Sequence, residues 1–338
     1  PVAYGLAVTI SDINVDGHAD IYVSNDFHEN DYLYINQGNG KFLESATKSF
    51  PHTSRFSMGN DIADINNDCY PDIVTLDMLP ADEEVIKTTA GEDSYDIYSY
   101  KLSFGYHHQF ARNALQLNNG MDESGTLLFS DIAALAGVEA TDWSWAPLLV
   151  DLDNDGNKDL FVANGIVTRP NDLDYMNFVS SDSAQSYYGY KEFIKNMPSG
   201  SVPNFLFRNE GNLRFRDISK EFIGQEPSVS TGAAYADLDN DGDQDIIVNN
   251  VNAKASILRN DIPDSQGWVQ FEFSGEGGNR FGIGAKVFVY CGGRSFYAEQ
   301  FLSRGWQSSV SPVLHIGVGN TRTIDSVSVV WPDGKYQT

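Results

Sequence analysis

The sequence predicts an all-β fold built from repeated units of about four short strands. The first observation is a nine-residue acidic phrase, with Asp at positions one, five and nine and Asn or Asp at position three. It occurs four times, at residues 12–20, 64–72, 151–159 and 237–245. The second observation is that a small apolar run precedes each phrase and a β-rich run, such as Ile21-Tyr22-Val23, follows it. Each phrase is therefore predicted to be the turn between two strands.

A second phrase, an alternating apolar run that ends in Asn, completes each unit. It occurs at residues 32–36, 114–118, 205–209 and 256–260, and in the first three copies a Phe-containing run follows. Repeated four-stranded units bury their faces against one another in a β-propeller. We therefore expect a propeller segment over residues 1–264, with blades at about 4–50, 57–133, 143–220 and 231–262. Four blades do not readily close a ring, so we expect a larger ring of about seven blades, with others upstream of Pro1.

Two blades carry insertions between their second and third strands. The long gaps before the third and fourth acidic phrases place these insertions at residues 79–112 and 166–203, where we expect short helices. In an up-and-down blade the first turn and the second connection lie at opposite ends. The acidic phrases and the insertions are therefore expected on opposite faces of the propeller.

The last part of the chain alternates apolar and polar residues in short runs separated by Gly-rich turns. These runs lie at 268–273, 285–290 and 326–330. The pattern predicts a small antiparallel β-module over residues 265–338.

The acidic phrase is suited to binding calcium. Side chains at positions one, three and five, the main-chain carbonyl at seven and both carboxylate oxygens at nine supply the six to eight hard oxygen ligands that Ca²⁺ takes, whereas Mg²⁺ prefers a rigid octahedron. We therefore predict up to four Ca²⁺ ions. The predicted ligand positions are Asp12, Asn14, Asp16, His18, Asp20, Asp64, Asn66, Asp68, Tyr70, Asp72, Asp151, Asp153, Asp155, Asn157, Asp159, Asp237, Asp239, Asp241, Asp243 and Asp245.

Two other interpretations of the phrase are less favourable. An EF-hand needs a Glu at position twelve and flanking helices, but position twelve falls inside a strand here. Ordinary Asp-, Asn- and Gly-rich turns would explain one copy, but four copies with the same ligand spacing favour a metal site. The second loop is predicted to bind most weakly, because Cys69 replaces the Gly of position six and the loop has one carboxylate fewer than the third and fourth.

Charge and composition exclude several classes of partner. The chain has 22 Lys and Arg against 47 Asp and Glu, a formal charge of −25, so nucleic acid and anionic membranes would be repelled. No apolar run approaches the roughly 18 residues of a membrane helix. Two cysteines, Cys69 and Cys291, allow one bridge at most, and two unpaired thiols are the simpler interpretation.

The two insertions come from neighbouring blades and are rich in Tyr and His, so they are expected to form one ligand-binding surface. The alternative is that most of these aromatic residues form the small cores of the insertions. The candidate ligand-binding residues are Tyr106, His107, His108, Arg112, Trp143, Trp145, Arg169, Tyr175 and Tyr188.

No hydrolase or metalloprotease motif is present, so a non-catalytic binding role for glycan or protein ligands is expected. The alternative is a calcium-dependent lyase or hydrolase that acts on polysaccharides.

The acidic phrases, together with Gly38-Asn-Gly-Lys-Phe42, resemble FG-GAP/VCBS repeats, which also form the calcium-loop blades of integrin α-chains. The C-terminal part resembles an ASPIC/UnbV module, through the motifs at 279–287, Gln300, 305–309, 315–319, 324–327 and 330–334. The order of motifs is similar to that of the cartilage-acidic-protein-like family. The resemblance implies a secreted or cell-surface, calcium-binding adhesion protein whose signal or lipoprotein leader lies upstream. Cys69 and a module end that lacks its last strands depart from the family pattern.

Overall fold

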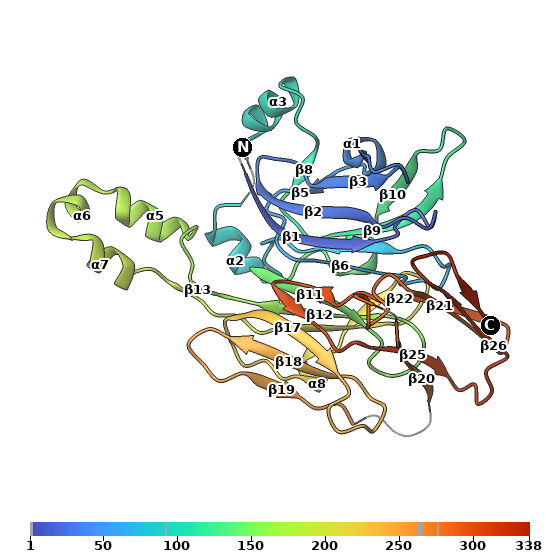
Figure 1. Ribbon diagram of the computed structural model, residues 1–338. Helices are drawn as coiled ribbons and strands as arrows, with labels where there is room; N and C mark the ends of the chain where they lie inside the picture. Colours follow the sequence, from blue (N-terminus) through green and yellow to red (C-terminus); the bar gives the residue numbers. More distant parts are fainter. Residues whose placement is uncertain (1–2, 92, 262–265, 276) are drawn as a thin grey trace.

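The protein is described by a computed structural model that covers residues 3–91, 93–261, 266–275 and 277–338 (Figure 1). The predicted boundary between propeller segment and module, at 264–265, lies outside these residues. The described part is mostly β-structure with a few short helices, and none of these helices combines the length and apolarity needed to cross a bilayer.

Three antiparallel four-stranded sheets and one three-stranded sheet form four propeller blades. Blade one consists of β1 (Ala3–Ser11), β2 (Asp20–Phe27), β3 (Tyr32–Asn36) and β4 (Phe42–Glu44). Blade two consists of β6 (Asn60–Ala63), β7 (Asp72–Thr75), β9 (Ala114–Met121) and β10 (Leu127–Asp131). Blade three consists of β11 (Ser144–Val150), β12 (Asp159–Asn164), β15 (Phe205–Asn209) and β16 (Phe215–Asp217). Blade four has β17 (Ser230–Ala236), β18 (Asp245–Asn250) and β19 (Ser256–Leu258). The predicted all-β propeller fold is confirmed.

The blades pack face to face, because apolar side chains point from both faces of a sheet into its neighbours. Tyr22 of blade one and Ile73 of blade two share one buried cluster, and Phe161 of blade three and Val248 of blade four share another. A one-turn helix follows the last strand of each of the first three blades; these helices are α1 (Ala46–Ser49), α4 (Ala133–Ala136) and α8 (Ser219–Phe222).

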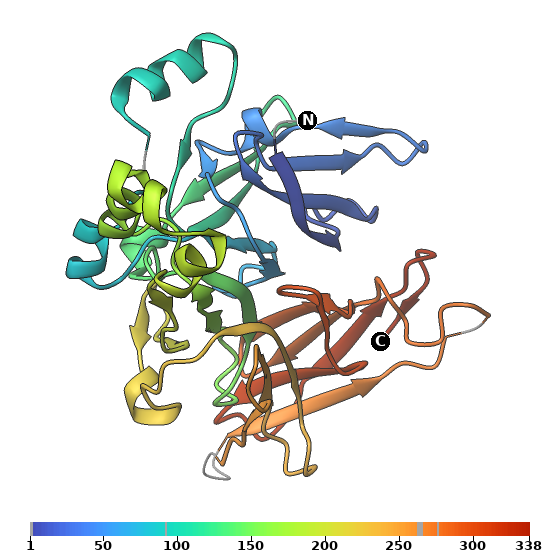
Figure 2. The ribbon, with the colours of Figure 1, turned by 90° about the vertical axis from the view of Figure 1, so that its left-hand side faces the viewer.

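Both insertions contain the expected short helices and project from the same side of the blades (Figures 1 and 2). The first holds α2 (Glu83–Thr88), α3 (Tyr95–Ser103) and β8 (Gln109–Phe110), which pairs with β5 (Thr53–Ser54). The second holds β13 (Ile166–Thr168), α5 (Leu173–Ser180), α6 (Asp182–Tyr187), α7 (Tyr190–Lys195) and β14 (Ser199–Gly200). The insertions touch where Ala90 N–H donates to the carbonyl of Asn171, but α3 and α5–α7 extend apart.

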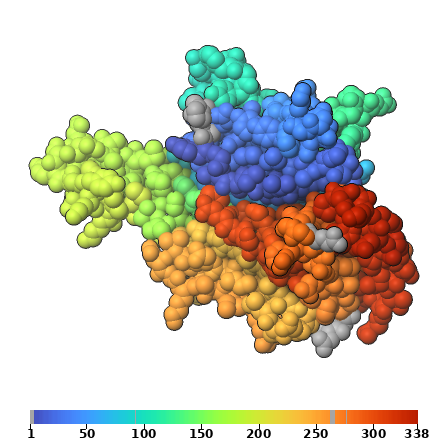
Figure 3. Space-filling model, in the orientation of Figure 1, coloured from blue at the N-terminus to red at the C-terminus, as the bar shows by residue number. Residues whose placement is uncertain are grey.

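The C-terminal module is an antiparallel β-structure around a small core that includes Val287, Phe296 and Ile316. Its strands are β20 (Gly267–Glu272) paired with β25 (Val313–Gly319), and the sheet β22 (Arg294–Glu299), β21 (Lys286–Cys291), β26 (Ser326–Val330) and β27 (Tyr336–Gln337). It packs against blades one and four at the end opposite the insertions (Figure 3). Cys69 and Cys291 are both free thiols.

A short hairpin of the module enters the space between the inner strands of the blades. It is formed by β23 (Ser303–Arg304) and β24 (Ser308–Ser309). Arg304 is buried and donates to Asp61 Oδ1 of β6 at 2.9 Å, while Asp61 Oδ2 accepts the N–H of Leu149 from β11. Trp306 packs against Trp145 of β11, with 5.1 Å between the ring centroids. The hairpin therefore joins the module to blades two and three from inside.

The last Asp of each acidic phrase fixes the fold of its own blade. One carboxylate oxygen accepts the N–H of position two of the loop, at 2.9–3.0 Å, and the other accepts the N–H of the Asn that ends the second phrase, at 2.8 Å. These aspartates are Asp20, Asp72, Asp159 and Asp245. Loop, second strand and third strand are thereby held together at one buried group.

In blades two, three and four, the Asn of the second phrase also links the blade to the one before it. The side-chain amide of Asn209 donates to the carbonyl of Lys158 in its own blade and to that of Ile65 in blade two. Asn118 and Asn260 make the corresponding bonds to Ile13 and Leu152. The amide of Asn36 in blade one donates to Ala19 of its own blade and to no preceding blade among the described residues.

Asn209→Ala should therefore destabilise the protein, because two backbone carbonyls lose their partner at a buried site. We expect the free energy of unfolding in urea to fall by about 1–3 kcal/mol. Asn36→Ala is the matched control and should cost less, since its amide bond is exposed and stays within one blade. Equal losses for the two variants would contradict the inter-blade role of this Asn.

Candidate metal centres

All four acidic phrases adopt the same loop conformation. The residue at position four has positive φ in each loop, between 57° and 61°. Position six also has positive φ, which Gly17, Gly156 and Gly242 adopt without a steric penalty. Cys69 occupies this position in the second loop with φ of 70°, which is uncommon for a residue with a side chain. The replacement of Gly by Cys69 at position six therefore keeps the loop shape at the cost of local strain.

Main-chain hydrogen bonds hold the carboxylates of each loop in place. The first Asp accepts the N–H of position six, at 2.8–3.1 Å, through one oxygen. The Asp at position five accepts the N–H of position seven, at 2.7–3.0 Å. Both bonds recur in every loop. The side chains of His18 and Tyr70 at position seven are exposed, so these residues have only their main-chain carbonyls to offer.

The third loop has the geometry expected of a cation site. Oxygen atoms of Asp151, Asp153 and Asp159 lie within 4.8 Å of one another. The Oδ1 atoms of Asp151 and Asp153 are buried and accept no hydrogen bond from any described residue. Buried carboxylate oxygens without a partner are costly, and a divalent cation would satisfy them. The donor set consists of hard oxygens, so it fits Ca²⁺.

The fourth loop gathers Asp237, Asp239 and Asp241 in the same way, but at a more exposed place. Over the described residues, no third group of this kind is found. In the first and second loops the residue at position three is Asn, whose side-chain amide donates to the Asp at position five at 2.9 Å. The prediction that the second loop binds most weakly stays a prediction.

Burial raises the pKa of several loop carboxyls in the absence of a bound cation. The pKa of Asp151 is raised to about 7, chiefly by desolvation, with the neighbouring carboxylates Asp155 and Asp153 also contributing to the rise. Desolvation likewise raises the pKa of Asp20 to about 7 and that of Asp64 to about 6. The fold thus holds acidic groups where their charge is unfavourable, unless a cation offsets it.

The C-terminal module covers the acidic loops, which the sequence patterns did not predict. The side chain of His315 contacts Asn154 of the third loop, with 2.6 Å between Nε2 and Oδ1, and Gly319 N–H donates to the carbonyl of Asn154. In the fourth loop, Gln270 donates to Asp237 Oδ2 at 3.0 Å. In the first loop, Lys286 forms an ion pair with Asp12. The motif at 315–319 was noted for its family resemblance, and the structure shows that it docks onto a loop.

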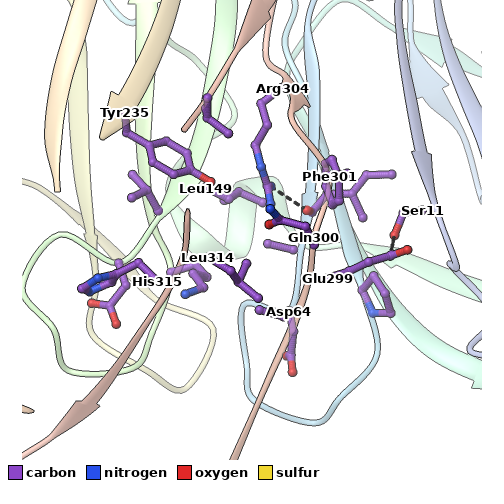
Figure 4. A pocket seen from close by; sticks show the side chains of 18 of the residues that line it. Ser11, Asp64, Leu149, Tyr235, Glu299, Gln300, Phe301, Arg304, Leu314 and His315 are labelled. Atoms are coloured by element: carbon purple, nitrogen blue, oxygen red, sulfur yellow. Dashed lines mark hydrogen bonds between the residues drawn. The ribbon is translucent and has the colours of Figure 1, made fainter. Parts of the chain in front are cut away.

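A small cavity of about 40 Å³ lies between the module and the blades (Figure 4). Asp64, Asp151, Glu299, Arg304 and His315 are among the residues that line it. This volume and these polar walls are sufficient for ordered water.

The predicted ligand-binding residues do not form one surface. Arg169 is buried and pairs with Asp142 at 2.7 Å, so its guanidinium is engaged inside the blade instead of lining an open site. In the second insertion, Tyr188 is 45% exposed but makes ring contacts with Phe178 and Phe193, and the hydroxyl of Tyr175 donates to the carbonyl of Phe193. The prediction that both insertions form one ligand-binding surface is therefore wrong, because the second insertion uses these aromatic residues to pack its own helices.

The remaining candidates lie around the first insertion and the third blade. His107 contacts the carbonyl of Phe50, and His108 contacts the hydroxyl of Tyr98. Arg112 pairs with Asp131 at 2.9 Å, and Trp145 donates to the carbonyl of Gly165. The side chains of Tyr106 and Trp143 are half-buried.

A groove of about 390 Å³ runs beneath α3. Of the predicted ligand-binding residues it includes His107. Tyr98 stacks on Phe110 along it, at 6.2 Å between centroids. Arg55, Lys101 and Asp93 form a charged cluster at the groove, in which Asp93 pairs with both cations. Sequence reasoning missed Arg55 and Lys101 because neither lies in a recognisable motif.

Gly317→Ala tests the docking of the module on the third loop. A Cβ at this position would lie 2.1 Å from Asp151 Oδ2, so the module and the loop would have to separate locally. We expect the free energy of unfolding to fall by about 1–3 kcal/mol, as for other overpacked sites. Gly278→Ala is the matched control in the same module, because its Cβ would meet no atom within 4 Å. An unchanged stability of Gly317→Ala would contradict the close contact.

Comparison with known proteins supports the two-part organisation. The FG-GAP-like repeat family matches residues 12–75 and 191–248, and the ASPIC and UnbV family matches residues 275–338. Cartilage acidic protein 1 of Mus musculus is 24% identical, over 98% of this chain and 42% of the mouse protein. The Homo sapiens protein of the same name is 23% identical, over 98% of this chain and 41% of its own length. The chain thus spans about two fifths of the length of these relatives.

Among solved structures, an Agrocybe aegerita lectin described as recognising non-reducing terminal N-acetylglucosamine covers 89% of this chain and 67% of its own, at 15% identity and a TM-score of 0.33. The family matches, the four blades and the module that covers their loops agree with one another. The chain therefore carries FG-GAP-like repeats followed by an ASPIC and UnbV module.

Proposed function

We propose that this chain is a calcium-stabilised binding module that works outside the cell. The observation that carries the proposal is the third loop, where two buried carboxylate oxygens, Asp151 Oδ1 and Asp153 Oδ1, accept no hydrogen bond from a described residue. Asp151, Asp153, Asp155 and Asp159 would hold Ca²⁺ there, and the corresponding aspartates would do so in the fourth loop. The ion would supply positive charge to a cluster that burial otherwise disfavours.

Calcium in these loops would strengthen the joint between propeller and module. Asn154 of the third loop contacts His315, and it also donates to the carbonyl of Gly242 and to Asp243 of the fourth loop. A rigid third loop therefore fixes both its neighbour and the module. Protein sites that bind calcium only at the high concentrations found outside cells are well known. This supports a secreted or cell-surface location.

The same acidic charge makes nucleic acid an unfavourable partner, and we propose a glycan or an extracellular protein as the ligand. The groove beneath α3 supports this choice. It is lined by the rings of Tyr98 and Phe110, with the charged cluster of Arg55, Lys101 and Asp93 beside them. The groove and the calcium loops lie at opposite ends of the blades, so binding at one does not require the other to open.

Calcium binding is tested by thermal and urea unfolding in EDTA and in excess calcium. A site at one hundred times its dissociation constant adds about 2.7 kcal/mol to the free energy of unfolding. We expect a clear rise with calcium for the unsubstituted chain and a smaller rise for Asp153→Asn. Asp333→Asn is the control, because Asp333 is an exposed acid outside the loops. Superimposable curves in EDTA and calcium would contradict the proposal.

Ligand binding is tested on an array of glycans, with the soluble products assayed at the same time. Tyr98→Ala should weaken binding to any positive glycan about tenfold, which corresponds to about 1.4 kcal/mol of lost contact. Tyr187→Ala is the control, since Tyr187 is 86% exposed on the second insertion and away from the groove. Full binding by Tyr98→Ala would place the ligand elsewhere. Release of unsaturated sugars would indicate the alternative function, a lyase that acts on polysaccharides.

A further inference from the structure

The first acidic loop differs from the other three because a lysine of the C-terminal module reaches into it. Lys286 and Glu299 face each other across the pair β21 and β22. Both side chains are buried and both contact the start of the loop: Lys286 pairs with Asp12, and Glu299 accepts hydrogen bonds from the Ser11 hydroxyl and the Asp12 N–H. A cross-strand pair of opposite charge is thus inserted against one calcium-type loop.

Both carboxylate oxygens of Asp12, at position one of the first loop, have hydrogen-bond partners. Asp12 Oδ1 accepts the N–H of Asp16 at 3.0 Å, and Oδ2 accepts the N–H of Gly17 at 2.8 Å together with the ammonium of Lys286. The equivalent Asp151 has an Oδ1 with no partner among the described residues. Asp12 is therefore in direct contact with an ammonium, whereas Asp151 forms no ion pair of this kind among the described residues.

We propose that Lys286 is a tethered cation that serves the first loop in place of a metal ion. This rests on the proposed calcium binding of the other loops. The ammonium group of Lys286 on Asp12 would repel a metal ion at the same carboxylate. Two positive charges that share one buried carboxylate lie close together, and their repulsion is strong where water does not screen it. The first loop then joins module and propeller whether or not calcium is present, and the third and fourth loops respond to calcium.

Two other loops also have a cation nearby, but of a different kind. Arg208 pairs with Asp153 of the third loop, and Arg259 lies 3.8 Å from Asp239 of the fourth. Both arginines approach position three instead of position one, and come from the third strand of the same blade or just after it. The exposed fractions of their side chains are 37% and 62%, against 10% for Lys286. An exposed side chain can swing into solvent when a metal ion arrives, whereas Lys286 is held by the packing of the module.

The test is the number of calcium ions bound per chain, measured by calorimetric titration and by elemental analysis after dialysis. Lys286→Gln should bind one calcium more than the unsubstituted chain. Arg259→Gln is the matched control and should leave the number unchanged. Lys286→Arg retains the positive charge and should also bind the original number.

The outcomes separate the two proposals. An equal, non-zero number for Lys286→Gln and the unsubstituted chain overturns the tethered cation and leaves calcium binding intact. No calcium in either chain overturns both.

A labelling experiment on the unsubstituted chain covers the case in which Lys286→Gln does not fold. Amine acylation, read by mass spectrometry, should modify Lys286 slowly both in EDTA and in calcium. Lys335 should react rapidly in both, because its side chain is 76% exposed. Fast labelling of Lys286 in calcium alone would show that the metal displaces it, and would overturn the proposal.

Discussion

The structure depends on how negative charge is neutralised beneath the C-terminal module. Four turns rich in carboxylates lie at one end of the blades, and the module packs against this end. Carboxylates that are crowded and buried raise one another's pKa and disfavour the folded state unless a cation or main-chain N–H groups offset their charge. The molecule uses N–H groups in every loop, a lysine in the first, and, in our proposal, calcium in the third and fourth.

The last Asp of each phrase has a structural role besides any contact with metal. Both of its oxygens accept main-chain N–H groups, one from its own loop and one from the Asn that ends the second phrase. That Asn in turn reaches the preceding blade. The same short phrases therefore build the loop, align the strands and set the spacing between blades. This explains why the two phrases occur together in all four blades, including the fourth, in which the described residues form three strands and Asn260 reaches Leu152 of the third blade.

Much of the fold could be predicted because its signals are local. The acidic phrase, its flanking strands and the gaps that mark the insertions all lie within short stretches of sequence. The packing of the C-terminal module over the acidic loops could not be predicted in the same way. Lys286 contacts Asp12, and Arg304 contacts Asp61, although more than two hundred residues separate the partners in each pair. No sequence pattern near either partner predicts these contacts.

The candidate ligand surface was less predictable than the loops. An aromatic residue in an insertion can face solvent or pack its own helices, and the sequence does not distinguish these cases. Tyr188 packs against Phe178 and Phe193, whereas Tyr98 lines the groove. Arg169 was expected at the surface, but Asp142 provides a buried partner for it. Which of these occurs depends on the tertiary neighbours of each side chain.

The most direct test of the central claim is a crystal structure at high resolution, grown in millimolar calcium and measured with anomalous scattering from the ion. The account predicts anomalous peaks in the third and fourth loops, each with six to eight oxygen ligands at about 2.3–2.6 Å. It also predicts the lysine ammonium, and no peak, beside Asp12. Loops three and four without a peak, with their carboxylates hydrogen-bonded to water, would contradict the account.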